Sequence, residues 1–465
     1  MVNTPAVVIA APASGSGKTT LATGLIGALR RAGHTVAPFK VGPDYIDPGY
    51  HGLAAGRPGR NLDPVLVGTE RVVPLYRHGT RGCDLAVVEG VMGLFDGRID
   101  ENDAAPVAEG STAQVAGLLG APVVLVVDTR GHSQSLAALL HGFATYDSEI
   151  ALGGVILNRV GSERHEQVLR AACERVGLPV LGALPRMTEL SVPSRHLGLI
   201  PAVEHGAAAQ AAVDAMTELV AAHVDLAAIA GLAACRVDAP PWDPADEVEA
   251  ITRHADPGPV IAVAGGVAFT FGYAEHRELL AAAGARVVVF DPLRDGLPTG
   301  TAGVVLPGGF PEEHAADLAA NEGLLGAVRE ACLAGMPVHA ECAGLLYLTR
   351  SLDGHRMAGV LDAAAEFGPR LTLGYRDAVA LNDSPLWTSG QRVRGHEFHR
   401  TRLTAAGPDT AAWAWRAPTG ETVREGALVH RVHASYLHTH PAGNPAAVTR
   451  FVASAAEYAA ARADA

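Results

Sequence analysis

The first half of the chain alternates short apolar runs with longer segments whose apolar residues recur at helical spacing. The runs are continuously apolar, which predicts parallel strands with both faces buried. They lie at residues 6–10, 35–40, 84–89, 122–127, 152–157 and 180–183. Alternating strands and helices are typical of a parallel sheet covered by helices on both sides. We therefore expect an α/β domain over residues 1–225.

A second alternation begins after a break in the pattern. An alanine-rich segment leads into Asp238-Ala239-Pro240-Pro241-Trp242-Asp243-Pro244, where prolines interrupt regular structure. We expect a linker over 226–257 and a second α/β domain over 258–455. Strands are predicted at 260–264, 286–290, 303–306 and 337–340, and helices at 274–283 and 322–334. The length of 465 residues also favours two domains.

Charge and composition narrow the class of protein. The formal net charge is −13, which argues against a nucleic-acid partner. The five cysteines are scattered without a pairing or metal-ligand spacing, as expected in a reducing compartment. We find neither a secretory signal pattern nor an apolar run long enough to span a bilayer. These features predict a cytoplasmic protein without a membrane partner, and they leave its oligomeric state, including a homodimer, open.

A glycine-rich loop follows the first predicted strand and precedes a helical segment. Backbone N–H groups in such a loop can surround a β-phosphate, and the helix N-terminus adds positive potential. The lysine of the motif reaches the β- and γ-phosphates, and the hydroxyl that follows it holds Mg²⁺. Pro12 replaces the first glycine of the usual pattern. We predict an ATP site made by Ser14, Gly15, Ser16, Gly17, Lys18, Thr19 and Thr20.

Lysine usage adds a second residue to this site. Among 36 basic residues, only Lys18 and Lys40 are lysines. In a chain that uses arginine almost everywhere, a retained lysine indicates a position that needs a compact ammonium group. Lys40 ends the second predicted strand, so we predict that it reaches the same phosphates. The alternative is a solvated surface lysine.

Polar residues follow other strands of this domain, at the edge where parallel sheets bind ligands. Asp44 and Asp47 follow the second strand. The alternative to a ligand-binding role is that they are ordinary turn residues. Glu89 closes the third strand and Asp96 comes shortly after it. An acid at this place assists Mg²⁺ binding in P-loop enzymes. Asn158 follows the fifth strand, placed either to read an adenine edge or to cap a helix.

Two stretches resemble signatures of the cobyrinic acid a,c-diamide synthases, which form amides in corrin (vitamin B12) biosynthesis. They are Phe39-Lys40-Val41-Gly42-Pro43-Asp44-Tyr45-Ile46-Asp47-Pro48 and Val88-Glu89-Gly90-Val91-Met92-Gly93-Leu94-Phe95-Asp96-Gly97. The synthetase domain of this family is similar to dethiobiotin synthetase, a P-loop enzyme that activates a carboxylate with ATP. The resemblance implies Thr19, Asp44 and Glu89 as Mg²⁺-site residues. It implies Asp47 and Asp96 as catalytic groups that serve the activated carboxylate or the metal.

A corrin substrate with many carboxylates would be bound by arginines, whose guanidinium groups pair with carboxylates bidentately. We favour Arg57 and Arg60 for this role. Solvated surface charge is the alternative for either residue.

The second domain places Cys342 in a tight turn between a predicted strand and a helix. Such a turn exposes the sulfur, and the helix N-terminus favours the thiolate. Gly308 and Gly309 end another strand, where their N–H groups can form an oxyanion hole. Further along the chain, His438 is available as a base. Together these residues resemble the active site of a class I glutamine amidotransferase.

One position departs from the usual pattern of that superfamily. A glutamate commonly stands two residues after the catalytic histidine, whereas this chain has His440 there. The group that orients His438 is therefore unassigned. His396 and His399 resemble a family motif but lack a complete set of metal ligands, so we expect no zinc site.

The resemblance implies ATP- and glutamine-dependent amidation of the a- and c-carboxylates of hydrogenobyrinate or cobyrinate through acyl phosphates, with Mg²⁺ as cofactor. The same chemistry on another tetrapyrrole, such as the cobyric acid step or nickel-sirohydrochlorin, is one alternative. A partition-type P-loop ATPase fused to a non-catalytic binding module is another, and the presence of both Cys342 and His438 argues against it.

Overall fold

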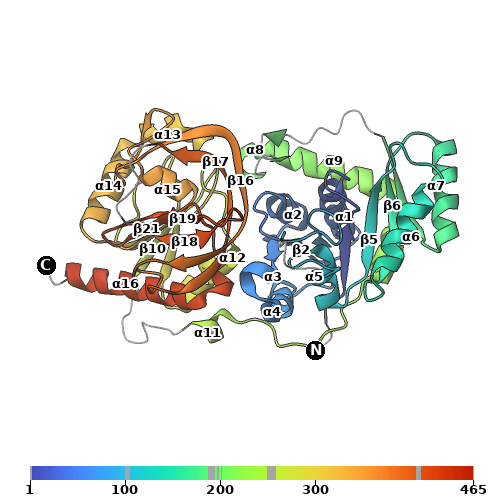
Figure 1. The fold of residues 1–465 in the computed structure, drawn as a ribbon, viewed down its shortest axis with the longest axis horizontal. Coiled ribbons are helices and arrows are strands. Elements are labelled where there is room, and N and C mark those ends of the chain that lie inside the picture. Colours follow the sequence, from blue (N-terminus) through green and yellow to red (C-terminus); the bar gives the residue numbers. More distant parts are fainter. Residues whose placement is uncertain are drawn as a thin grey trace. The chain divides into compact units, whose positions relative to one another are not determined.

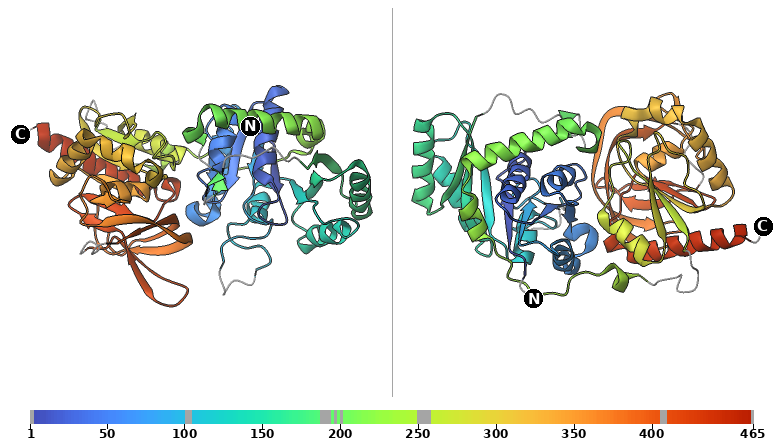
Figure 2. Two further views of the ribbon diagram at one scale, coloured as in Figure 1. Left: turned by 90° about the horizontal axis from the view of Figure 1, so that it is seen from above. Right: turned by 180° about the vertical axis from the view of Figure 1, so that it is seen from behind.

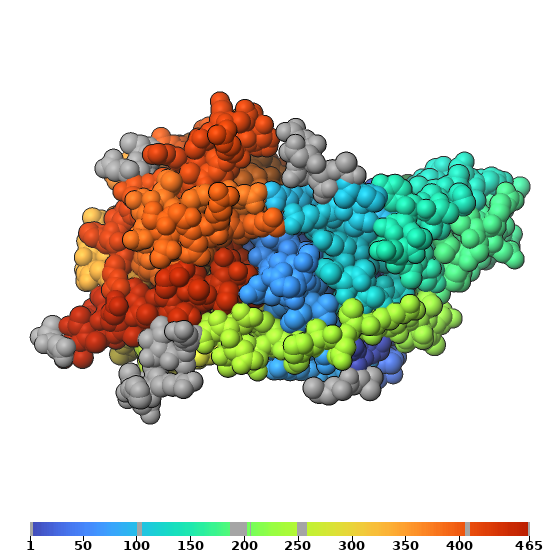
Figure 3. All heavy atoms as spheres, turned by 60° about the horizontal axis from the view of Figure 1, so that its bottom comes forward, coloured from blue at the N-terminus to red at the C-terminus, as the bar shows by residue number. Residues whose placement is uncertain are grey.

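The chain forms two compact units, Met1–Trp242 and Asp243–Ala465, as seen in a computed structural model (Figure 1). The structure describes residues 3–99, 105–186, 194–195, 198–199, 202–248, 258–404 and 410–463. The junction between the units falls within the linker expected at 226–257. The segment from α10 (Leu226–Leu232) to α11 (Pro244–Glu247) lies at the molecular surface (Figure 3).

The first unit is built on a parallel sheet in the strand order β3-β2-β4-β1-β5-β6-β7. Its strands β1, β2, β4 and β5 are buried along almost their whole length, which explains their continuously apolar sequences. The six predicted strands are found within three residues of their expected ends, and β3 is added at the sheet edge. The strands are β1 (Ala6–Ala10), β2 (Val36–Val41), β3 (Arg60–Leu62), β4 (Leu85–Glu89), β5 (Val123–Asp128), β6 (Leu152–Val160) and β7 (Val180–Pro185), and a separate pair is β8 (Ser194–Arg195) with β9 (Gly198–Leu199).

Helices of the first unit connect these strands and cover the sheet. They are α1 (Lys18–Arg31), α2 (Asp47–Ala55), α3 (Pro64–Val67), α4 (Thr69–Gly79), α5 (Thr112–Leu119), α6 (Leu136–Tyr146), α7 (Glu163–Val176), α8 (Ala202–His205), α9 (Ala207–His223) and α10. Helices α1 and α9 lie side by side (Figure 2). Their close approach depends on Gly27, because a Cβ there would lie 2.1 Å from the Thr217 hydroxyl.

The second unit contains a sheet in the order β11-β10-β12-β13-β21-β20, parallel except for the β20–β21 pair. Its four predicted strands are all found. The strands are β10 (Val260–Ala264), β11 (Arg286–Phe290), β12 (Thr301–Leu306), β13 (Val338–Glu341), β20 (Ala427–Val429) and β21 (Val432–Ser435). The helices are α11, α12 (Ala274–Ala282), η1 (Pro311–His314), α13 (Ala315–Ala320), α14 (Glu322–Leu333), α15 (Ala343–Leu348), η2 (Pro441–Gly443) and α16 (Pro445–Ala463).

A further sheet in this unit was not predicted. It consists of β14 (Ser351–Leu352), β15 (His355–Arg356), β16 (Ala364–Ala380), β17 (Arg392–Leu403), β18 (Trp413–Arg416) and β19 (Thr422–Glu425). Its long antiparallel pair β16–β17 projects from the unit in orange (Figure 2). Because many residues of β16 are exposed, its sequence lacks the continuous apolar run that identified the buried parallel strands. In the described part of the chain, no helix has the length and apolarity needed to cross a membrane.

Candidate active sites

The glycine-rich loop connects β1 to α1 and closes around the Lys18 side chain. Gly15 and Gly17 have φ angles of 77° and 96°, in the left-handed region that favours glycine. Lys18 Nζ donates to the carbonyl of Ala13 at 3.4 Å and to the carbonyl of Met92. Burial, and then the nearby Lys40 charge, lower the pKa of Lys18 to about 8. Within the same loop, Ser14 is exposed, Ser16 is buried, and Thr19 and Thr20 lie in the first turn of α1.

Lys40 joins three carboxylates at the end of the neighbouring strands β2 and β4. Its Nζ lies 2.7 Å from Asp47 Oδ2, 2.9 Å from Glu89 Oε1 and 4.0 Å from Asp44 Oδ2. Lys40 and Glu89 are partners in the β2–β4 register, which explains their contact. Only 5% of the Lys40 side chain is exposed, so it is not a solvated surface lysine. The surrounding carboxylates raise the pKa of Lys40 against the opposing effect of burial.

Thr19 and His51 complete this cluster around Glu89. Thr19 Oγ1 lies 2.7 Å from Glu89 Oε1 and 3.1 Å from Asp47 Oδ2. The other oxygen of Glu89 lies 2.6 Å from His51 Nε2, and His51 Nδ1 lies 2.9 Å from the Thr23 hydroxyl. His51 was not predicted from the sequence. Its spacing offered a signal, since a residue four positions after Asp47 lies on the same face of a helix.

The two central carboxyl groups have opposite proton affinities. Burial favours the neutral form of Glu89, but the Lys40 charge and the His51 hydrogen bond outweigh it and lower the pKa of Glu89 to about 2. Burial and the negative charge of Asp44 raise the pKa of Asp47 to about 7. Near neutral pH, Glu89 is therefore ionised, whereas Asp47 gains or loses its proton.

Asp44 and Asp96 both accept hydrogen bonds from backbone N–H groups of their own loops. Asp44 Oδ1 accepts from Ile46 at 2.8 Å and from Asp47 at 3.0 Å, which fixes the turn before α2. Asp96 Oδ2 accepts from Gly93 at 3.1 Å, and its charge acts on Lys18. The structure thus gives each residue a loop-stabilising contact at the edge of the site.

Two residues at the end of β6 hold the glycine-rich loop from the other side. Asn158 Nδ2 donates to the Ser16 carbonyl at 2.8 Å. Arg159, with a left-handed φ of 61°, donates to the Gly15 carbonyl at 3.0 Å and pairs with Asp128. Asn158 therefore contacts the predicted nucleotide loop directly, and Arg159 is a contact that the sequence analysis missed.

Arg57 and Arg60 are not brought into this cluster. The Arg57 guanidinium donates to the carbonyls of Gly79 and Arg81 at 3.1 and 3.3 Å, at the end of α4. Arg60 is paired with Phe39, one residue before the Lys40 position, so its side chain points to the opposite face of the sheet. The expectation placed both arginines at the ligand-binding edge because the short strand β3 was not foreseen.

Cys342 occupies a strained turn between β13 and α15. Its φ is 49°, a conformation that non-glycine residues rarely adopt. Gly344 lets the turn pack against β12, because a Cβ there would lie 2.2 Å from the Leu306 carbonyl. The N–H groups of Gly309 and Ala343 point to the thiol. Burial nevertheless raises the pKa of Cys342, so the thiolate expected from the helix N-terminus is not favoured without a base.

His438 is held beside the predicted glycine pair. A Cβ on Gly308 would lie 2.4 Å from His438 Cε1, so only glycine allows this approach. The backbone of His438 exchanges two hydrogen bonds of 2.9 Å with His396 of β17. His396, which had no expected role, therefore fixes the backbone of the predicted base.

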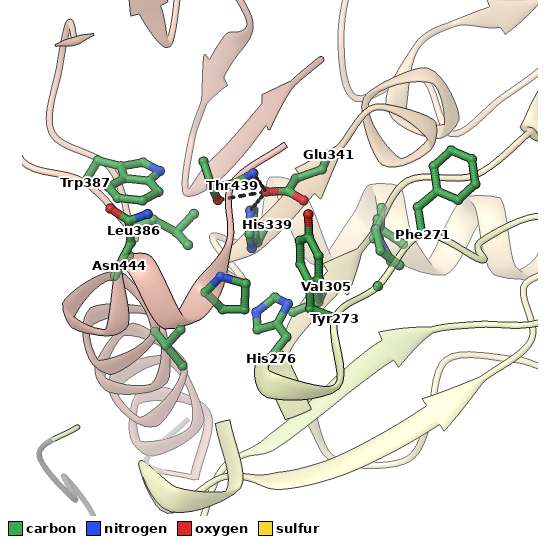
Figure 4. A pocket seen from close by; sticks show the side chains of 16 residues that line it. Phe271, Tyr273, His276, Val305, His339, Glu341, Leu386, Trp387, Thr439 and Asn444 are labelled. Carbon is green, nitrogen blue, oxygen red and sulfur yellow. Dashed lines mark hydrogen bonds and ion pairs between the residues drawn. The ribbon is translucent and has the colours of Figure 1, made fainter. Parts of the chain in front are cut away.

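Glu341 lies between His339 and Thr439, to which dashed lines join it in Figure 4, and it also faces His438. One of its oxygens is 3.7 Å from His438 Nδ1. The other accepts from the Thr439 N–H at 3.1 Å and hydroxyl at 3.0 Å, and lies 3.2 Å from His339 Nε2. A cavity of about 30 Å³ beside Glu341, large enough for a water molecule, is also lined by Tyr273.

Comparison with known proteins explains this pair of sites. Residues 7–200 match the model of a CobQ/CobB/MinD/ParA nucleotide binding domain, and residues 260–446 match a CobB/CobQ-like glutamine amidotransferase domain. The chain is 62% identical to the hydrogenobyrinate a,c-diamide synthase of Mycobacterium tuberculosis, over 97% of this chain and 98% of the relative. This chain belongs to the a,c-diamide synthase family.

Other a,c-diamide synthases match over similar spans. The hydrogenobyrinate a,c-diamide synthase of Streptomyces coelicolor is 55% identical, over 96% of this chain and 97% of the relative. The cobyrinate a,c-diamide synthase of Gloeobacter violaceus is 42% identical, over 96% of both chains. The protein is therefore a glutamine-dependent, amide-forming ligase with an ATP-binding domain, and not a partition-type ATPase with an inert module.

Proposed function

We propose that the chain amidates the a- and c-carboxylates of hydrogenobyrinate, using ATP and glutamine, in the cytoplasm. The observation that carries this proposal is that one chain holds two clusters: Lys40 with its carboxylates beside Lys18, and Cys342 with His438 against the glycine pair. The relatives at 62% and 55% identity are named for hydrogenobyrinate, which supports the metal-free corrin over cobyrinate. Five free cysteines, among the described residues, support a reducing compartment.

The first centre activates the substrate carboxylate. An oxygen of that carboxylate attacks the γ-phosphorus of ATP, the bond to ADP breaks, and an acyl phosphate forms. Lys18 and Lys40 supply positive charge where the phosphates carry negative charge. Asn158 and Arg159 hold the loop that surrounds the phosphates. Ammonia then attacks the acyl carbon, and inorganic phosphate leaves.

The residues at this centre fit a magnesium ion. Thr19 Oγ1 lies 2.7 Å from Glu89 Oε1 and 3.1 Å from Asp47 Oδ2, and Mg²⁺ prefers such oxygen ligands. When bound, Mg²⁺ neutralises charge that develops on the phosphate oxygens. In the described part of the chain, His, Cys, Asp and Glu side chains form no group of three that could hold a metal. We propose Thr19 and phosphate oxygens as further ligands.

The second centre releases ammonia from glutamine. His438 removes the Cys342 proton as the sulfur attacks the glutamine amide carbon, which gives a γ-glutamyl thioester and ammonia. We propose that the N–H groups of Gly309 and Ala343, which point to the thiol, stabilise the oxyanion of this step, whereas Gly308 of the predicted pair leaves room for His438. Water then releases glutamate from the thioester. Because burial disfavours the free thiolate, the transfer of this proton to His438 is essential.

One experiment tests both centres. Wild type and Cys342→Ala are incubated with ATP, Mg²⁺, hydrogenobyrinate and either glutamine or ammonium chloride at alkaline pH, and products are followed by mass spectrometry. We expect two successive amidations by wild type with either nitrogen donor. Cys342→Ala should amidate with ammonium only, because carboxylate activation does not use the thiol. Retained glutamine use by this variant, or activity with cobyrinate alone, would contradict the proposal.

A further inference from the structure

We propose that Glu341 positions His438 for glutamine hydrolysis and so replaces the glutamate that commonly follows the catalytic histidine two residues later. This inference rests on the proposed function, in which His438 is the base for Cys342. It assigns the missing orienting group to the residue immediately before the nucleophile, on β13.

The Glu341 carboxylate is held so that one oxygen remains for His438. Its Oε1 is fixed by the N–H and hydroxyl of Thr439, at 3.1 and 3.0 Å, and by His339 at 3.2 Å. Its Oε2 faces His438 Nδ1 at 3.7 Å. Catalytic contacts are often longer before substrate binds, so this distance suits a contact that tightens during reaction.

Glu341 is ionised as this role requires. Burial raises the pKa of its carboxyl, but hydrogen bonds and charge from His339 and His438 lower it far more. An anion at Nδ1 keeps the imidazole in the tautomer whose Nε2 accepts a proton. The same anion stabilises the imidazolium once the Cys342 proton has been transferred.

The Glu341 charge would be a disadvantage without such a role. A carboxylate beside Cys342 raises the pKa of the thiol and so opposes formation of the nucleophile. Stabilisation of protonated His438 offsets this penalty, because the same anion then favours the transfer of the proton from sulfur to imidazole.

His440 occupies the position where a glutamate is usual, but it has a different task. Its Nδ1 accepts a hydrogen bond from the Ala442 N–H at 3.2 Å and caps η2. Its ring lies 4.0 Å from the ring of Tyr273, centroid to centroid. The orienting carboxylate has thus moved to another strand, while the former position serves the local fold.

The test compares Glu341→Gln with Glu330→Gln, which removes a carboxylate on the exposed face of α14. Glutamate release from glutamine is measured at several glutamine concentrations, together with ammonium-driven amidation. Glu341→Gln should lower kcat for glutamine hydrolysis by about 10²-fold with a KM within about threefold of wild type. Ammonium-driven amidation should be unchanged, and Glu330→Gln should match wild type throughout.

The rate at which iodoacetamide alkylates Cys342 separates a positioning role of Glu341 from a simple charge effect on the thiol. If Glu341 acted only by its charge on the thiol, Glu341→Gln would speed alkylation of Cys342 by iodoacetamide and leave kcat intact or raised, which would overturn the proposal. A rise in KM alone would overturn it as well. Should Glu341→Gln fail to fold, Thr439→Val, which removes one hydrogen bond to Glu341, is tested in its place. We expect its kcat to fall by about threefold or more, and a wild-type kcat would refute the role.

Cys342→Ala, measured in parallel, keeps this inference separate from the proposed function. Retained glutamine hydrolysis in Cys342→Ala would refute the glutaminase site itself. Loss of hydrolysis in Cys342→Ala with full hydrolysis in Glu341→Gln would refute only the role of Glu341.

Discussion

Replacing Lys40 by methionine should destabilise the first unit strongly, because it leaves a buried cluster of carboxylates without its cation. Lys40 is 5% exposed and Glu89 is 1% exposed, and their charged atoms lie 2.9 Å apart. Removing one partner of such a buried pair costs about 3–5 kcal/mol. For a unit of this size, 1 kcal/mol corresponds to about 2–4 °C in Tm. Lys40→Met should therefore lower the Tm of the first unit by about 6–20 °C at pH 8.

The pH dependence of this loss follows from the pKa shifts. The raised pKa of Lys40 means that its stabilising charge is present throughout the range from pH 5 to pH 8 in wild type. In Lys40→Met, the remaining carboxylates repel one another until protons neutralise them. The Tm difference between variant and wild type should therefore shrink as pH falls from 8 to 5.

Differential scanning calorimetry can measure this effect, with the first unit identified as the transition that added ATP raises. Arg31→Met is the matched control, because Arg31 pairs with Asp214 at 3.2 Å on the surface, with both side chains about half exposed. Such a pair contributes less than about 1 kcal/mol. A loss for Lys40→Met no larger than for Arg31→Met, or one that grows towards pH 5, would refute the reasoning.

Three further predictions concern activity. Lys18→Arg should lose most ATP-dependent amidation, because a planar guanidinium does not fit the closed loop; near-normal rates at saturating ATP would contradict this. Gly308→Ala should abolish glutamine hydrolysis, since its Cβ would lie 2.4 Å from His438 Cε1, while ammonium-driven amidation measured in parallel continues. Apparent Mg²⁺ affinity should rise as pH increases through about 7, where Asp47 loses its proton, and Asp47→Asn should remove this dependence in Mg²⁺ titrations.

The parts of the molecule that the sequence predicted are those encoded by local patterns. The buried parallel strands have continuous apolar runs, and the turn around Cys342 has its own compact signature. Neither of these patterns predicts the strand order. The rule that ligands bind at the carboxyl ends of parallel strands nevertheless predicted that Lys40 and Glu89 lie at the same edge of the sheet. Their pairing on β2 and β4 agrees with that expectation.

The structural features that the sequence did not predict depend on contacts between distant segments of the chain. The facing direction of Arg60 is set by its register on β3, a strand of three residues with no periodic pattern to detect. The contact of Glu341 with His438 joins the end of β13 to the segment after β21, and no local pattern reveals that these two strands are neighbours. The half-exposed strand β16 resembles a polar loop when only apolar runs are sought.

The adjacency of β13 and β21 has a consequence for biosynthesis on the ribosome. Glu341 and Thr439 are 98 residues apart in sequence, yet they touch because these strands are neighbours. Contacts of such long separation form late, since loop closure must precede them. The segments that carry Cys342 and His438, the proposed nucleophile and base, therefore come together only after β21 has emerged and joined the sheet. A partly synthesised chain cannot consume glutamine, although its completed first unit has had time to fold.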